Sequence, residues 1–294
     1  MSTRLAAALI SRRTFVADAH GRDDSATPAG DNGAPCPDDS ASMTPPLSLL
    51  HQDEHLVAVH KPAGLLVHRS QLARGEREFL LQRLRDQIGQ RVYPVHRLDR
   101  PTSGVILFAL DPQTAASLQR AFTARRVEKR YLAVVRGIGP PQERLTYPLR
   151  EEEGHRPKAE MPAMEAVTEI RRLDSVELPT QVDRYPQSRY SLIEARPQTG
   201  RRHQIRRHLS RRGYPIIGDA KHGKGNHNRF FAEHLACPRL LLAAVSLAFD
   251  HPASGHRLEL CCPLDACMTN LFEGFGWAGH LPAPPRHPDR RVMP

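Results

Sequence analysis

The amino-acid sequence predicts an α+β fold, and three observations lead to this expectation. Apolar runs of strand length, such as 56–59 and 105–110, are mixed with segments of helical spacing, such as 78–88. Their order shows no steady strand–helix–strand repeat, which a doubly wound parallel sheet would need. The chain has 294 residues, enough to bury a substantial core as one large domain or two smaller ones.

The two ends of the chain are expected to lie outside this core. Residues 18–46 consist largely of Asp, Ser, Pro, Gly and Ala and have too few apolar side chains to offset the entropy of ordering. From residue 277 onward the chain is rich in Pro, His and Arg. We therefore expect a disordered extension over 1–46, a folded domain over 47–276 and a tail over 277–294.

Three helices are expected from their spacing and their end signals. Residues 78–88 carry leucines and an isoleucine at helical spacing, and Gly89 follows as a C-terminal cap. Asp111 supplies an N-cap for the second helix, with a proline in the first helical position. The third helix is expected at 203–211.

The apolar runs between these helices are interpreted as strands. The expected strands are 56–59, 65–68, 105–110, 127–137, 166–173, 190–195, 239–249 and 257–260. The polar, proline-rich residues 139–162 are expected to form a long surface connection.

Charge and cysteine content restrict the class of protein. A net charge of +10 favours an acidic partner, nucleic acid first, and no apolar run reaches the ~18 residues of a membrane span. The five cysteines form no C-x-x-C pair, which favours reduced thiols and a cytoplasmic location. His251, His256, Cys261 and Cys267 fit no zinc-ligand spacing, so neither a metal site nor a metal-dependent nuclease is expected.

Asp99 is the candidate reactive group. It lies in the stretch Tyr93 to Gly104, among arginines, a histidine, a proline and a glycine, and an apolar strand follows. A turn at the end of a buried strand can present one carboxylate rigidly. The alternative is that Asp99 only shapes the turn.

A basic segment is the candidate for binding an anion. Seven arginines and two histidines lie between Arg196 and Arg212, and no acid occurs between Glu194 and Asp219. The planar guanidinium of arginine can donate two parallel hydrogen bonds to a phosphate. Such a segment can also be only the solvent-exposed face of a helix. Tyr131, which follows two basic residues, could stack on an extruded base or be a core tyrosine.

The chemistry that these residues favour uses a single anion. An arginine beside a buried aspartate keeps it ionised, and such a carboxylate suits attack on, or proton abstraction beside, an electron-poor centre. Glycoside hydrolysis generally pairs two carboxylates. The sequence also lacks the H-E-x-x-H, Walker and G-x-S-x-G motifs, so metal, P-loop nucleotide and hydrolase chemistry are not favoured.

Five motifs, in order, resemble those of the RluA-type pseudouridine synthases over roughly residues 47–272. They are Lys61-Pro62-Ala63-Gly64 with Val67-His68, His96-Arg97-Leu98-Asp99-Arg100-Pro101-Thr102-Ser103-Gly104, Lys129-Arg130-Tyr131 through Arg136-Gly137, Thr199-Gly200-Arg201-Arg202-His203-Gln204-Ile205-Arg206, and Pro215-Ile216-Ile217-Gly218-Asp219. The resemblance implies one catalytic domain with a mostly antiparallel mixed sheet, split by a central RNA-binding cleft.

The resemblance also implies roles for individual residues. Asp99 matches the catalytic aspartate, Arg206 the arginine paired with it, and Tyr131 the tyrosine that packs on the target base. Leu241 and Leu242 fall where the family places apolar residues beneath the base, while Ala243 replaces a usual histidine, so a contact there is missing. The residues expected to bind RNA are Arg97, Arg100, Lys129, Arg130, Arg201, Arg202, His203, Arg207 and Lys221. The lysine and proline of the first motif are expected to be mainly structural.

The implied reaction converts a uridine in RNA into pseudouridine without cofactor or metal. The motifs 100–104 and 217–223, with Asn228 and Arg229, most resemble family members that modify uridine 65 of tRNA. We expect a monomer that acts on tRNA. Two alternatives stay open, namely a ribosomal RNA substrate and a non-catalytic RNA-binding protein on the same scaffold.

Overall fold

The computed structural model describes residues 45–69, 75, 78–150 and 161–283. Among these residues it contains five α-helices and a short 3₁₀ helix, which are α2 (Leu80–Ile88), α3 (Pro112–Thr123), α4 (Gln204–Arg211), α5 (Gly225–His234), α6 (Ala266–Gly274) and η2 (Ala278–His280). The strands are β1 (Leu49–Gln52), β2 (Leu56–Lys61), β3 (Tyr93–Pro94), β4 (Ser103–Ala109), β5 (Glu128–Arg136), β6 (Gln142–Leu145), β7 (Leu149–Arg150), β8 (Ala163–Met164), β9 (Thr168–Leu178), β10 (Ser188–Pro197), β11 (Leu242–Asp250) and β12 (Arg257–Cys261).

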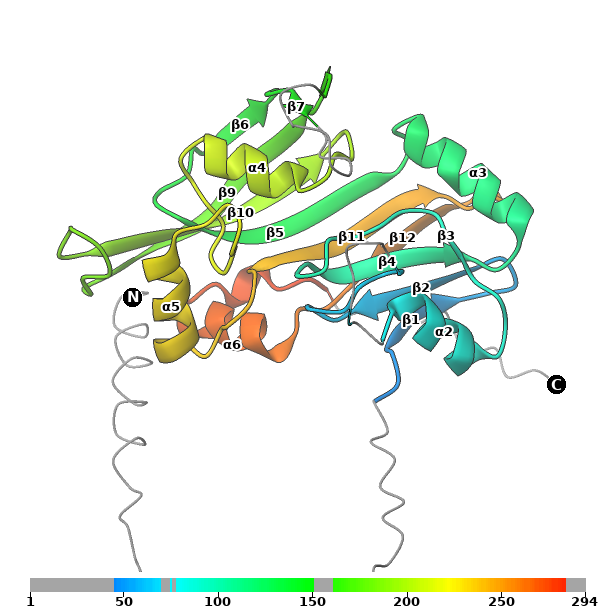
Figure 1. Cartoon of the computed structure of the whole chain (residues 1–294), viewed down its shortest axis with the longest axis horizontal. Coiled ribbons are helices and arrows are strands. Elements are labelled where there is room, and N and C mark those ends of the chain that lie inside the picture. Colours follow the sequence, from blue (N-terminus) through cyan, green and yellow to red (C-terminus); the bar gives the residue numbers. More distant parts are fainter. Residues whose placement is uncertain (1–44, 70–74, 76–77, 151–160, 284–294) are drawn as a thin grey trace, which may run out of the picture.

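One ten-stranded sheet runs through the described part of the molecule (Figure 1). Its order is β1-β2-β4-β11-β5-β10-β9-β6, with β3 beside β4 and β12 beside β11. The β4–β11 pair is parallel, and the other pairs within the described ranges are antiparallel. The expected α+β class and mostly antiparallel mixed sheet are therefore confirmed.

The helix signals in the sequence were read correctly at two ends. The Asp111 carboxylate accepts a hydrogen bond from the amide of Thr114 at 2.8 Å, as an N-cap of α3 does. Gly89 follows α2 with φ of 70°, a left-handed conformation that glycine adopts without steric cost.

Two expectations about strands were wrong. Residues 65–68 form only an isolated bridge between Leu66 and Phe79, because the carbonyl oxygens of Leu66 and Val67 accept hydrogen bonds from the first amides of α2. The expected connection 139–162 contains β6 and β7. These two strands are short and polar, so hydrophobic alternation did not reveal them.

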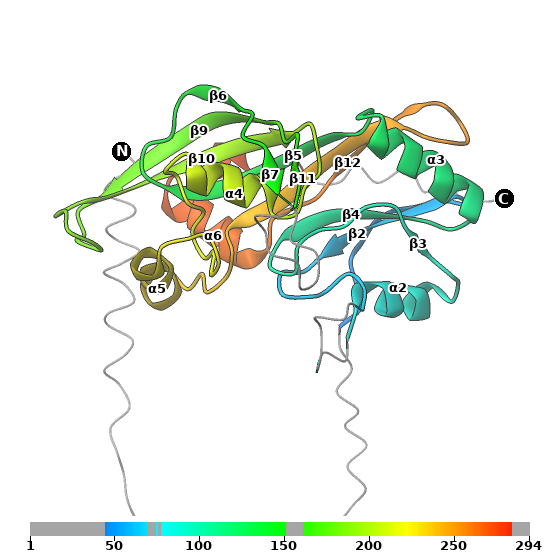
Figure 2. The ribbon, with the colours of Figure 1, turned by 45° about the horizontal axis from the view of Figure 1, so that its top comes forward.

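Alternate side chains of β5 pack into two different layers of the core, one on each face of the sheet. Leu132 and Val134 of β5 pack with α5 and α6, whereas Ala133 and Val135 pack with α4 on the other face. Figure 2 shows α4 over this part of the sheet. A third cluster joins β2 and β4 to α2 and α3. Tyr131 packs against both this cluster and the one under α4, so it lies where the two halves of the sheet meet.

Gly104 permits the contact between these halves. Its φ is +117°, and a Cβ at this position would lie 2.1 Å from the carbonyl oxygen of Ala244 on the parallel strand β11. Only glycine, which has no Cβ, fits such a conformation and such a close backbone approach.

We expect Gly104→Ala to lower the free energy of unfolding by at least about 3 kcal/mol, because strain and a backbone clash combine. Gly255→Ala is the matched control, since Gly255 also has a positive φ of +71° but open space around it. The control should cost only about 1–2 kcal/mol. Urea unfolding measures both, and equal losses would show that the close contact with β11 is unimportant.

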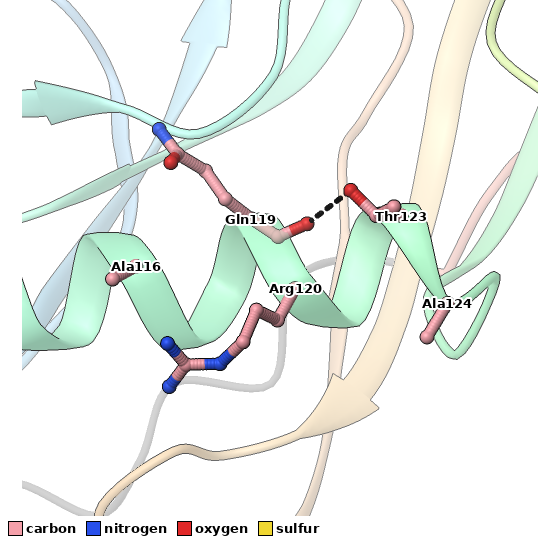
Figure 3. Close-up of a pocket in the computed structure, with 5 residues that line it drawn as sticks. All are labelled: Ala116, Gln119, Arg120, Thr123 and Ala124. Carbon is pink, nitrogen blue, oxygen red and sulfur yellow. Dashed lines mark hydrogen bonds between the residues drawn. The ribbon is translucent and has the colours of Figure 1, made fainter.

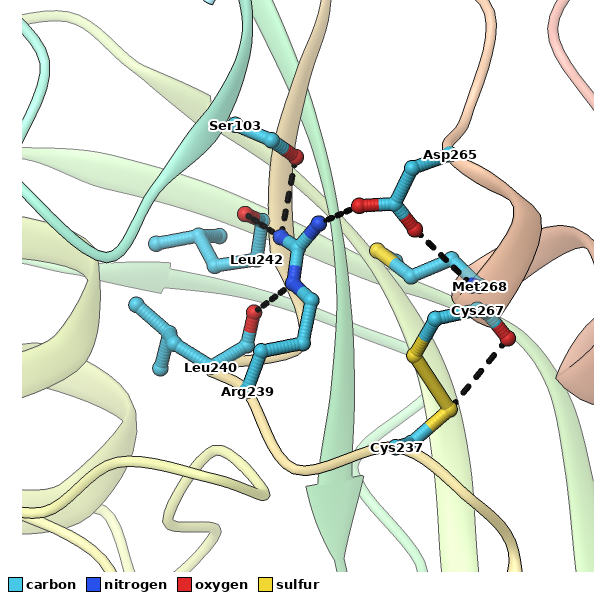
Figure 4. Close-up of a disulfide and its surroundings, with 8 residues drawn as sticks. All are labelled: Ser103, Cys237, Arg239, Leu240, Leu242, Asp265, Cys267 and Met268. Atoms are coloured by element: carbon cyan, nitrogen blue, oxygen red, sulfur yellow. Dashed lines mark hydrogen bonds and ion pairs between the residues drawn. A yellow bond between two sulfur atoms is a disulfide. The ribbon is translucent and has the colours of Figure 1, made fainter. Parts of the chain in front are cut away.

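A disulfide joins Cys237 to Cys267, with their Cα atoms 5.6 Å apart (Figure 4). The expectation of reduced thiols throughout was therefore wrong, since spacing along the sequence could not show that residues 30 apart meet in space. Beside the disulfide, the Arg239 guanidinium donates to Ser103 Oγ at 2.9 Å and pairs with Asp265. Arg239 thus fastens the segment before β11 to the start of β4.

The core extends beyond the expected domain boundary at residue 276. Trp277 is only 1% exposed and packs edge-on against Phe272 and Phe275. The tail expected from 277 therefore begins later. Residues 1–44 and 284–294 lie outside the described residues, and so do most of the expectations for the two ends. No helix in the described ranges is long and apolar enough to cross a membrane.

Candidate active site

Asp99 occupies the first position of a tight turn that leads into β4. Its carbonyl oxygen accepts a hydrogen bond from the amide of Thr102 at 3.0 Å, with Arg100 and Pro101 between them. The ring of Pro101 fixes φ at the third position of this turn. The Asp99 side chain is 18% exposed, so the carboxylate is largely enclosed but reachable.

Lys61 ties this turn to the first motif. Its buried ammonium donates hydrogen bonds to the carbonyl oxygens of Pro62, Leu65 and Arg100, at 2.8, 2.8 and 3.0 Å. Burial and the Arg239 guanidinium lower the pKa of Lys61 to about 7, while the charge of Asp99 raises it. All three N–H donors of the ammonium are used, so the protonated form holds the turn in place.

Lys61→Met should lower the free energy of unfolding by about 3 kcal/mol, because three buried carbonyl groups lose a donor. Lys224→Met, at an exposed position, should change it by less than about 0.5 kcal/mol. Thermal and urea unfolding of both variants test this expectation. Equal stability of the two variants would contradict a structural role for Lys61.

Arg206 is the partner of Asp99. It lies in α4 with its side chain 5% exposed, and its Nη1 donates to Asp99 Oδ2 at 3.1 Å. The other side of the guanidinium binds Asp219 in a two-pronged contact, from Nε and Nη2 at 2.8 Å each. Burial would lower the pKa of Arg206, but the contacts with Asp219 and Asp99 raise it overall. One fully charged guanidinium therefore bridges two carboxylates.

Asp219 holds Arg206 in position, and its role was not recognised from the sequence, although it ends the fifth motif. Its side chain is completely buried. Burial would raise the pKa of Asp219, but hydrogen bonds from Arg206 and from the amides of His222 and Lys221 lower it. Asn228 at the start of α5 binds the Asp219 carbonyl oxygen at 3.0 Å. This network fixes the orientation of the guanidinium.

Tyr131 lies on β5, on the face of the sheet that α4 covers. Burial raises the pKa of the Tyr131 phenol, and the charge of Asp99 raises it further, so the phenol is neutral at pH 7. Asp99 is close enough to act on this ring electrostatically. The site thus brings together one residue from a turn, one from a strand and one from a helix.

Strand alternation separates some of the other expected residues. Lys129 lies on the same face of β5 as Tyr131. Arg130 points to the opposite face, where its Nη1 lies 3.5 Å from Glu194 Oε2. Leu242 belongs to the cluster that Tyr131 contacts, while Leu241 belongs to the cluster with α5 and α6. The structure therefore places Lys129 and Leu242, but not Arg130 and Leu241, on the Tyr131 side.

The remaining basic residues lie around the turn and α4. Arg97, Arg100 and Lys221 are exposed, and Arg100 Nε donates to the carbonyl oxygen of Gly64 at 3.0 Å. Arg201 Nε donates to the carbonyl oxygen of Glu165 at 3.0 Å. Arg202, His203 and Arg207 line a small depression beside Asp99.

A second, open depression lies along α3, away from these groups (Figure 3). It is lined by Ala116, Gln119, Arg120, Thr123 and Ala124, none of which was expected in the site. Its side chains offer one guanidinium and no carboxylate. The chemistry therefore belongs to Asp99 and its neighbours, where an enclosed anion, a fixed cation and an aromatic ring meet.

The matching family model is that of the RNA pseudouridylate synthases, which covers residues 55–211, more than half of the chain. This range includes Asp99, Tyr131 and Arg206. The chain therefore belongs to the RNA pseudouridine synthases of the RluA type, which are isomerases.

The chain is similar to curated proteins named tRNA pseudouridine synthase C. The one from Vibrio cholerae is 48% identical over 239 residues, which are 80% of this chain and 98% of that protein. The one from Salmonella typhi is 47% identical over 80% of this chain and 92% of that protein. Among solved structures, human RNA pseudouridylate synthase domain containing 4 matches with a TM-score of 0.59 and 25% identity, over 81% of this chain and 94% of that chain.

Proposed function

We propose that this protein isomerises uridine 65 of tRNA to pseudouridine, with Asp99 as the reacting group. The observation that carries the proposal is the hydrogen-bonded ion pair between Asp99 and Arg206, 107 residues apart in the chain and 3.1 Å apart in space. The names of the similar curated proteins support tRNA as the substrate. The motif resemblance supports position 65.

The reaction rearranges one nucleotide without adding or removing atoms. The bond from C1′ to N1 breaks, the uracil turns within the site, and C5 bonds to C1′. C5 then loses its proton and N1 gains one. The ionised carboxylate of Asp99 either attacks C1′ or removes the C2′ proton, and both roles need the anion. Arg206 keeps that anion charged and oriented.

The other residues act on the position of the base and the backbone. The uridine must leave its stack to reach Asp99, which costs a few kcal/mol. Packing of the uracil on Tyr131 and contacts of the basic residues with phosphates offset this cost. We propose that Lys129, Arg202 and Arg207 contribute to these phosphate contacts, since Lys129 lies on the Tyr131 side and the two arginines line the depression beside Asp99. Arg201, which belongs to the same motif, is proposed to contribute as well.

We also propose that the domain beginning at residue 47 provides all of the catalysis and recognition. The described site draws its residues from β2 to α5, within that domain. The protein is proposed to act as a monomer in the cytoplasm, where tRNA is available, and without a cofactor.

The test incubates the purified protein with unmodified tRNA and maps pseudouridine by carbodiimide-dependent stops of primer extension. We expect one new stop, at uridine 65 in the T arm, close to its junction with the acceptor stem. A stop found only in ribosomal RNA would overturn the tRNA substrate and leave the chemistry intact. No stop in either RNA would contradict the proposed activity.

A further inference from the structure

Four basic side chains surround a small depression next to Asp99. Arg202, His203, Arg207 and His222 line it. His222 was not expected in the site and comes from the segment that follows Asp219. The depression lies beside the reacting carboxylate, since His203 Nε2 is 3.9 Å from Asp99 Oδ2.

The two histidines form a fixed wall of this depression. His203 Nδ1 and His222 Nε2 are 3.1 Å apart, and the rings meet edge-on. Two hydrogen bonds hold the backbone of His222. Its amide donates to Asp219 Oδ1 at 3.0 Å, and its carbonyl oxygen accepts from Ser210 Oγ at 2.8 Å. His203 has a left-handed backbone with φ of 53°, which costs about 1 kcal/mol or more and is often kept at functional sites.

The hydrogen bond within this pair fixes the positions of the protons. Burial lowers the pKa of His203 to about 4 and also lowers that of His222, so both rings are neutral at pH 7 and only one can donate to the other. An N–H of His203 facing Asp99 is favourable, and a lone pair there is not. His203 therefore carries its proton on Nε2 and accepts from His222.

The charge of the depression is positive. Arg202 and Arg207 both line it, and the Arg207 guanidinium donates to the backbone carbonyl oxygen of Arg202 at 3.5 Å. The carboxylates of Asp99 and Asp219 are both bound by Arg206. The N-terminus of α4 adds its partial positive charge. Planar guanidinium groups of this kind suit the oxygens of a phosphate.

We propose that this depression binds one of the two phosphate groups that flank the target uridine. The inference rests on the proposed function, because a nucleotide whose C1′ faces Asp99 brings its own phosphates within a few ångströms of this wall. The contact fixes the sugar relative to the carboxylate. It acts on the one nucleotide that reacts, whereas the other basic residues hold the flanking RNA.

The test is a double-mutant cycle between protein and RNA. The RNA is an unmodified hairpin with the T-arm sequence, in which the phosphate on the 5′ or the 3′ side of the uridine is replaced by an uncharged methylphosphonate. Wild type, Arg207→Gln and Arg202→Gln are compared with Arg211→Gln. The control residue lies on the same helix and stacks on Tyr147, outside the depression. Binding is measured by filter retention at fixed salt.

At one of the two positions, methylphosphonate should weaken binding to wild type and to Arg211→Gln by about tenfold. The same change should weaken binding to Arg207→Gln by less than about twofold, because the partner of that phosphate is already lost. Arg202→Gln should also show a reduced penalty, because Arg202 lines the same depression, and this second variant keeps the test valid if Arg207→Gln folds poorly. Equal penalties in all four proteins at both positions would overturn the proposal.

The same samples separate this inference from the proposed function. Pseudouridine formation is measured with wild type on the unsubstituted hairpin and on tRNA. Absence of product on both contradicts the proposed function, whatever the binding cycle shows. Product together with purely additive binding penalties overturns the phosphate site alone.

Discussion

Asp99→Asn should reduce pseudouridine formation to background, a loss of about four orders of magnitude or more, as for other enzymes that lose their one reacting side chain. The substitution keeps the size of the side chain and leaves an oxygen that can accept from Arg206 Nη1. It removes the negative charge that both candidate roles of Asp99 need. Single-turnover conversion of unmodified tRNA measures the effect.

Binding of tRNA to this variant should stay within about threefold of wild type, because Asp99 is not expected to contact phosphate. Asp86→Asn is the control, since Asp86 is 65% exposed on α2 and pairs with Arg85. It should keep full activity. If Asp99→Asn retained more than about a tenth of the wild-type rate, another group would have to perform the chemistry.

Arg206→Met should have the second-largest effect and should act on stability as well as on activity. It leaves the completely buried Asp219 carboxylate and the largely buried Asp99 carboxylate without their cation. Removing one partner of a buried ion pair costs about 3–5 kcal/mol. Arg211→Met, on the same helix and exposed, should cost less than about 1 kcal/mol. Urea unfolding compares the two variants.

The pH dependence of stability tests the same network through Asp219. The folded protein lowers the pKa of Asp219, so its ionisation stabilises the fold at neutral pH, and this contribution is lost as the pH falls through the folded-state pKa. The stability difference between wild type and Asp219→Asn should be constant from about pH 8 to 5 and shrink below about pH 4. A difference that grows towards acid would show that Asp219 is not held as an anion.

The sequence led to the pairing of Asp99 with Arg206, and the structure places the two side chains in contact. The third helix was expected at 203–211, and the motif resemblance selected Arg206 within it as the partner of Asp99. The turn residues around Asp99 and the caps at Gly89 and Asp111 were also readable, because each depends on local backbone chemistry. The sequence therefore predicted the contact between Asp99 and Arg206 and the local backbone features, while the catalytic roles stay predictions.

The residues around the centre of the site could not be predicted from the sequence, because their positions depend on how the strands and loops pack in three dimensions. Alternation shows that Arg130 and Tyr131 face opposite sides, but not which side faces α4. The same reasoning applies to Leu241 and Leu242. The contact of Asp219 with Arg206 and that of Cys237 with Cys267 arise from loop packing, which has no periodic signal. These residues became identifiable only from their positions in the fold.

The most direct test of the account is the structure of the Asp99→Asn protein bound to unmodified tRNA. We expect uridine 65 to be turned out of its helix, its base on Tyr131 and its C1′ about 3–4 Å from the side chain of residue 99. A uridine bound on the opposite face of the sheet, or one that remains stacked in the RNA far from residue 99, would contradict the account.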